Sequence, residues 1–133
     1  MTFQFSEFPG IDQNQVNKLR EVDIESTDDL MRLWADEPKR ASLATETGIS
    51  LEQLSKYASM ARLARVKNVG PKHVELLMAA GIDGPRSLFE YTPASLVMRL
   101  GEVKAEKKLT AEMPELIEIQ SWFLDVKPVV VGS

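Results

Sequence analysis

Residues 68–88 read NVGPKHVELLMAAGIDGPRSL, and a second stretch of the chain repeats their pattern. Residues 10–30, GIDQNQVNKLREVDIESTDDL, align with them at an offset of 58 positions. The alignment brings apolar residues opposite one another: Val16 and Val74, Leu19 and Leu77, Ile24 and Ile82, Leu30 and Leu88. Self-similarity at a fixed offset is typical of repeat architectures. We therefore expect two copies of one unit, each with a tight turn before a short amphipathic helix.

Signals for helix starts and ends occur along the whole chain. Ser50 and Gln53 have the spacing of a capping box before an apolar helical pattern. Three prolines stand where a first helical residue can lack its N–H: Pro71, Pro85 and Pro93. Three glycines stand where a left-handed helix end is favoured: Gly48, Gly81 and Gly101. No stretch combines strand alternation with hairpin turn residues, so the sequence predicts an all-α protein of about eight short helices.

Length and composition limit the classes of protein to consider. The chain has 133 residues, which suits one compact body, and no apolar run approaches the roughly 18 residues of a membrane span. Cysteine is absent, which excludes disulfides and thiolate metal sites. Because the first residues, MTFQFSEF, lack the features of a secretory signal, we expect a cytoplasmic protein. The net charge of −4 predicts that any contact with a polyanion is local.

Both turns resemble the loop of a helix-hairpin-helix motif, whose usual form is apolar, Gly, apolar, Gly and then a helix. The second copy reads Asn68-Val69-Gly70 before Pro71-Lys72-His73. Over about residues 8–126 the chain resembles an uncharacterised bacterial family, a domain of unknown function with two degenerate copies of this motif. The resemblance implies an all-α fold of two tandem helix-hairpin-helix repeats packed into one compact body.

The pattern divides the chain into a first repeat over residues 1–65, a second repeat over 66–127 and a tail over 128–133. We expect the repeats to pack through their longer closing helices. The apolar sides of these helices comprise Leu51, Leu54, Tyr57, Ala58 and Leu63 in the first and Leu116, Ile119, Trp122 and Phe123 in the second. Trp34 and Trp122 are interpreted as core residues.

The second turn is the predicted binding site. Consecutive N–H groups in a glycine-rich turn at a helix start form a positive concavity for a phosphate oxygen. Glycine accepts positive φ there and leaves room for a close approach, and asparagine also visits the left-handed region readily. The resemblance implies phosphate contact by the amides of Gly70 and Lys72 and by the Lys72 side chain. The candidate nucleic-acid-binding residues are Arg62, Arg65, Lys67, Asn68, Val69, Gly70, Lys72 and His73.

The first turn departs from the motif. Asp12 takes the place of the second glycine, Glu7 lies just upstream, and no basic residue precedes Lys18. A carboxylate at this position disfavours a phosphate, whereas aspartate is a good N-cap for the helix that follows. We interpret the first turn as structural.

Two functions remain open at this point. The first is weak, sequence-independent binding of a DNA or RNA backbone through the second turn, and the alternative is a protein-interaction adaptor in which both turns are only structural. We expect no enzyme, because His73 is the only histidine and is interpreted as an exposed polar residue. No cofactor, metal or membrane partner is expected, and the oligomeric state stays open.

Overall fold

The computed structural model describes residues 2–109 and 112–124. In this part of the chain all regular elements are helical. They are η1 (Phe5–Glu7), α1 (Gln13–Arg20), α2 (Thr27–Trp34), α3 (Glu37–Thr47), α4 (Leu51–Ala64), α5 (Pro71–Ala79), α6 (Pro85–Leu88), α7 (Pro93–Lys107) and α8 (Leu116–Trp122). The predicted all-α class with about eight helices is confirmed, whereas the predicted tail over 128–133 lies outside the described residues.

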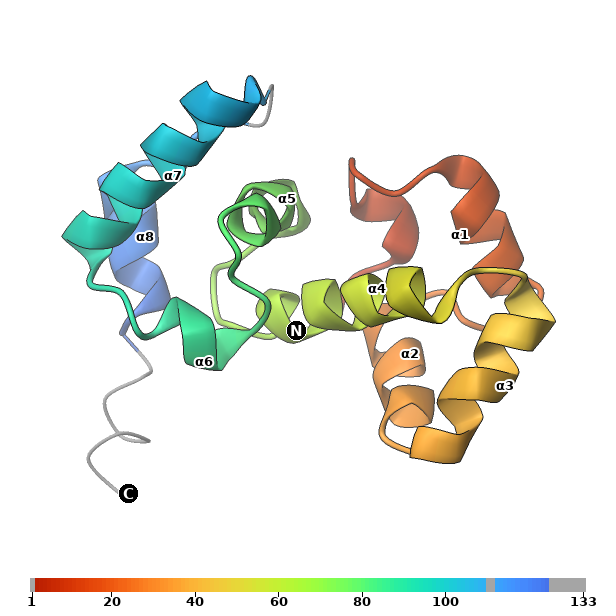
Figure 1. Cartoon of the computed structure of the whole chain (residues 1–133). Coiled ribbons are helices and arrows are strands. Elements are labelled where there is room, and N and C mark those ends of the chain that lie inside the picture. Colours follow the sequence, from red (N-terminus) through yellow and green to blue (C-terminus); the bar gives the residue numbers. More distant parts are fainter. Residues whose placement is uncertain (1, 110–111, 125–133) are drawn as a thin grey trace.

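Helix α4 runs through the middle of the molecule and joins two groups of helices (Figure 1). Helices α1, α2 and α3 surround its first half, α5 lies alongside its other end, and α6, α7 and α8 lie beyond that end (Figure 1). Helix α4 packs on α2, α3 and α5, while α5 packs on α7 and α7 on α8. One continuous cluster of buried apolar side chains runs through both groups.

The order and spacing of the helices repeat along the chain. Helices α5 and α6 begin 58 positions after α1 and α2, and α8 ends 58 positions after α4. The segment that connects α1 to α2 and the segment that connects α5 to α6 share the same backbone hydrogen bonds. Two equivalent examples run from the N–H of Ile24 to the carbonyl of Leu19 (2.9 Å) and from Ile82 to Leu77 (3.0 Å). These two connecting segments therefore have matching backbone geometry.

Most predicted helix ends are confirmed. Ser50 caps α4 by accepting the N–H of Gln53 at 3.1 Å, although the Gln53 side chain makes no return contact within the described residues. Gly48 and Gly81 have the expected left-handed φ, at 73° and 84°. Gly101 does not end a helix, so that prediction is wrong: α7 continues through it to Lys107, and the turn of helix around it is held by the buried side chains of Leu100 and Val103. The three prolines open α5, α6 and α7.

The closing helices pack differently from the prediction. Most of their apolar residues are buried, as is Trp34, but Leu51 and Leu116 are each 49% exposed. The main partner of α8 is α7, and the main partner of α4 in the second group is α5. Helix α8 is short, the side chains that it buries are Ile119 and Trp122, and the Trp122 ring lies against His73 of α5. None of the described helices combines the length and apolar character that crossing a membrane requires.

Candidate nucleic-acid interface

The turn between α4 and α5 is anchored to the rest of the second group. The Val69 side chain is buried, at 2% exposure, and its N–H donates to the carbonyl of Val66 at 3.1 Å. Asn68 has a φ of 72°, which confirms that asparagine supplies the left-handed residue of the turn. The Asn68 carbonyl accepts the Nε1–H of Trp122 at 3.0 Å. These contacts hold the turn in one shape before any ligand arrives.

Gly70 leaves the start of α5 open. Its φ of −101° and ψ of 166° are ordinary extended values, so this glycine is not needed for positive φ. A Cβ added there would meet no heavy atom within 4 Å, and no side chain caps the helix. Pro71 has no N–H, and the N–H groups of Gly70 and Lys72 donate to no other group in the described part of the chain. Both amides are therefore without an acceptor among the described residues, beside open space at the Gly70 Cα.

The first turn shows what such an amide binds in this fold. Asp12 is the N-cap of α1, as predicted, and its Oδ1 accepts the N–H of Asn14 at 3.0 Å. Asp12 and Asn14 precede Gly70 and Lys72 by the same 58 positions that relate the two groups of helices. In the first turn a carboxylate oxygen thus accepts the N–H of Asn14, whereas in the second turn no described protein group accepts the equivalent N–H of Lys72.

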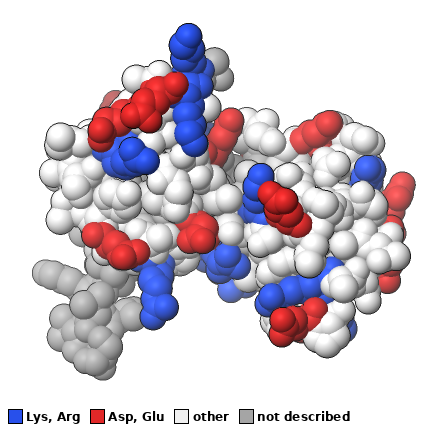
Figure 2. Space-filling model, viewed as in Figure 1, with Lys and Arg blue, Asp and Glu red and all other residues white. Residues whose placement is uncertain are grey.

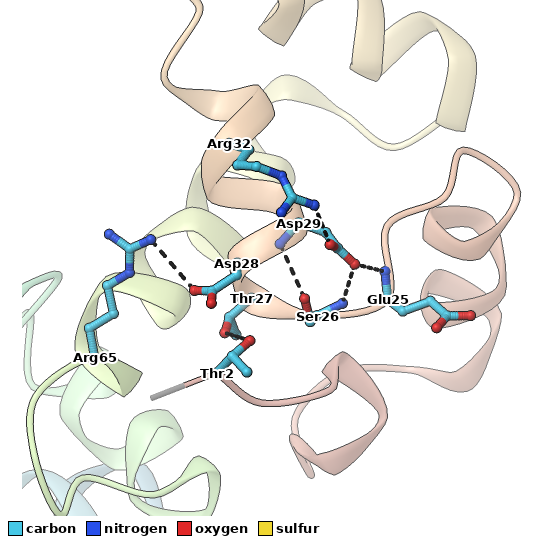
Figure 3. Close-up of polar contacts among 8 residues, drawn as sticks. All are labelled: Thr2, Glu25, Ser26, Thr27, Asp28, Asp29, Arg32 and Arg65. Atoms are coloured by element: carbon cyan, nitrogen blue, oxygen red, sulfur yellow. Dashed lines mark hydrogen bonds and ion pairs between the residues drawn. The ribbon is translucent and has the colours of Figure 1, made fainter.

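Two of the predicted basic residues are engaged elsewhere. The guanidinium of Arg62 donates to Ser59 Oγ at 2.8 Å and to the carbonyl of Asp83 at 3.5 Å. Arg65 reaches from the end of α4 to Asp28 in α2, with 3.6 Å between Arg65 Nη2 and Asp28 Oδ1 (Figure 3). That pair is about half exposed, so it adds little stability but still directs the side chain toward the first group of helices.

Lys67 and Lys72 are the basic side chains that remain available at the turn. Both are exposed, and neither forms an ion pair with another described residue. Lys107 of α7 instead donates to the carbonyl of Ala79, at the opposite end of α5 from Lys72. Positive and negative side chains are interspersed on the face shown in Figure 2. The positive charge at the turn is therefore local and small.

His73 does not belong to the binding surface. The His73 side chain is 2% exposed, and its ring centroid lies 5.5 Å from that of Trp122. The backbone N–H of His73 donates to the carbonyl of Gly70. Neither ring nitrogen has a hydrogen-bond partner among the described residues, and Nε2 lies 3.8 Å from Glu118 Oε2. The prediction that His73 is exposed is wrong, because this side of α5 faces α8.

Protonation of His73 is expected to destabilise the protein. Burial lowers the pKa of His73 below its ordinary 6.5, and the Glu118 carboxylate offsets only part of this effect. The unfolded chain therefore takes up the proton first, and stability falls as the pH drops through 6.5 toward the folded pKa. Asp29 acts in a separate range, because backbone N–H groups lower its pKa and its contribution is lost only below 3.8.

Urea unfolding at about pH 7.5 and pH 5.5 measures the decrease in the free energy of unfolding that His73 is expected to cause. His73→Phe keeps an aromatic ring against Trp122 but does not titrate, so its unfolding midpoint should depend less on pH than that of the unchanged protein. Equal pH dependence of the two proteins would contradict the expected role of His73.

A family model described as Domain of unknown function (DUF4332) matches residues 9–127. The match includes both turns and all eight α-helices of the described chain. No curated protein and no solved structure matches the chain.

Proposed function

Because the chain belongs to the DUF4332 family, whose function is unknown, we infer its activity from its own residues and propose a non-enzymatic module that binds nucleic-acid backbone. We interpret the two turns as degenerate helix-hairpin-helix loops, of which the second binds phosphate. One observation carries the proposal. The Lys72 N–H has no acceptor among the described residues, whereas the equivalent Asn14 N–H donates to a carboxylate oxygen.

The chemistry of the turn favours an anion with several oxygens. Two amide groups at the start of α5 lie at the positive end of a helix dipole, and Lys67 and Lys72 add charge beside them. A phosphodiester offers an oxygen to the amides while its charge attracts the lysines. Since backbone amides and flexible lysines carry no base-specific pattern, the proposed binding is independent of sequence.

The proposed affinity is low. With a single open turn, two available lysines and a net charge of −4, only one or two phosphate contacts are expected. Non-specific affinities are on the order of 10⁻⁴ to 10⁻⁶ M at physiological salt for proteins that make more contacts than this. The only histidine is buried, which supports binding without a catalytic step that uses this ring.

Replacing Lys72 with glutamine is expected to weaken binding and to lower its salt dependence. Loss of one phosphate contact reduces the slope of log K against log salt by about 0.9 for duplex DNA and about 0.7 for a single strand. Fluorescence anisotropy of labelled DNA and RNA, between about 50 and 200 mM salt, measures both effects. Lys39→Gln in α3 makes the same change of charge in the other group of helices and serves as the control. Equal slopes for the two variants would contradict a contact by Lys72.

A protein-interaction adaptor is the second candidate, and a specific observation favours it. Of the five large apolar side chains that are strongly exposed in the described chain, four lie on α7 or α8 or just after α8: Met98, Leu116, Ile117 and Leu124. Ile117 on α8 and Leu124, two residues after the end of α8, are each 70% exposed. If the unchanged protein binds no nucleic acid even at low salt, this surface becomes the preferred candidate.

A further inference from the structure

A hollow of about 260 Å³ lies beside the proposed phosphate site. Its walls come from the turn between α4 and α5, from α6 and the residue after it, and from α8. They are formed by Arg65, Val66, Lys67, Pro85, Phe89 and Trp122. Four of these residues are apolar or aromatic, Val66, Pro85, Phe89 and Trp122, and together they are called the floor here; the other two, Arg65 and Lys67, are cationic. The Phe89 ring is braced edge-on by Phe123, with 5.5 Å between the ring centroids.

The hollow is continuous with the proposed phosphate site. Lys67 belongs to both, and Trp122 in the wall donates its Nε1–H to the Asn68 carbonyl in the turn. Gly70 follows Lys67 by three residues, so at most roughly 10 Å of chain separates the open amide from the edge of the hollow. A group attached to a phosphate at the turn is therefore within reach of the aromatic floor.

The hollow has room for one ring system. Complete small-molecule sites usually measure about 300–1,000 Å³, so this space suits part of a larger ligand. An unpaired nucleotide combines an anionic group that suits Lys67, the lining cation that forms no ion pair with another described residue, with a flat base that can pack on Phe89. In a duplex the faces of the bases are stacked on one another and are not available to such a floor.

We propose that this hollow takes the base of an unpaired nucleotide whose phosphate lies on the turn at Gly70 and Lys72. The inference rests on the proposed function and narrows its ligand to single-stranded nucleic acid. The aromatic floor recognises any base, because every base has a π-face, so the protein prefers single strands without preferring a sequence.

The test compares four labelled probes of equal phosphate number in anisotropy titrations. They are oligo(dT), oligo(U), a DNA duplex and an abasic DNA strand that keeps the sugar-phosphate chain without bases. The unchanged protein is expected to bind oligo(dT), oligo(U) or both more tightly than the abasic strand and the duplex. The first two probes distinguish DNA from RNA as the source of the base.

Phe89→Ala is expected to reduce affinity for the preferred single strand about 5- to 100-fold, toward the affinity for the abasic strand. Phe89→Leu keeps an apolar contact with Phe123 and serves as the second variant if the alanine variant does not fold. Suppose that all four probes bind with equal affinity and that binding still depends on Lys72 and on salt. This result would overturn the proposal that the hollow takes a base, but it would leave the proposed function standing. Absence of binding to every probe would overturn both.

Discussion

Substitution of Gly70 by aspartate is expected to abolish nucleic-acid binding and, at the same time, to stabilise the fold. The variant copies the first turn, where Asp12 caps α1 and occupies the N–H of Asn14 at 3.0 Å. Gly70 has an extended backbone and open space at its Cβ, so the new side chain fits without strain. Its carboxylate is expected to accept the Lys72 N–H, which we propose binds the phosphate, and its negative charge repels the phosphate.

The two effects are measured separately. Affinity should fall at least about tenfold at low salt, whereas a new N-cap in place of glycine raises the free energy of unfolding by only a few tenths of a kcal/mol to about 1 kcal/mol. Gly70→Asn is the matched control, because asparagine caps as well as aspartate without adding charge, and it should lose less affinity. If Gly70→Asp is stabilised yet binds nucleic acid as the unchanged protein does, the phosphate does not lie on these amides.

Replacing Trp122 with alanine is expected to lower the free energy of unfolding by about 3–5 kcal/mol. Trp122 is 1% exposed, packs on the His73 ring and donates to the Asn68 carbonyl, so one side chain ties α8 to α5 and to the turn. The total free energy of unfolding of a natural domain is about 5–15 kcal/mol, so this change would remove a large part of the stability. Urea unfolding followed by circular dichroism measures it.

The size of the hydrogen-bond contribution follows from a second variant. Trp122→Phe retains a ring against His73 but removes the Nε1–H, so it should cost about 1–3 kcal/mol, less than alanine. In both variants Trp34 is the only tryptophan left, and its fluorescence reports on the first group of helices. A Trp34 transition that stays unchanged while the helical signal shifts would show that the groups unfold independently, contrary to the shared core.

An uncapped helix start is the structural cost of the proposed site. The first turn satisfies its amide with its own carboxylate, and the second leaves the equivalent amide open. Glycine in place of a good N-cap residue typically costs only a few tenths of a kcal/mol.

The sequence was sufficient for the features that depend on nearby residues. The helix starts at the prolines, the N-cap at Asp12 and the left-handed turn at Asn68 all agree with the structure. Each depends on backbone preferences or on hydrogen bonds between residues a few positions apart, which the order of residue types records directly. The open amide at Lys72 also follows from such local geometry, because no capping side chain stands at Gly70.

Only the tertiary structure decided which of the predicted site residues are available. His73 is buried by α8, which follows α5 by more than 35 residues, and Arg65 is drawn to Asp28 on α2. The hollow at Phe89 likewise exists only where α6, α8 and the turn meet. These features depend on contacts between residues far apart in the chain. A local pattern states that a helix has an apolar side, but the packing of the other helices determines what covers that side and what stays open to a ligand.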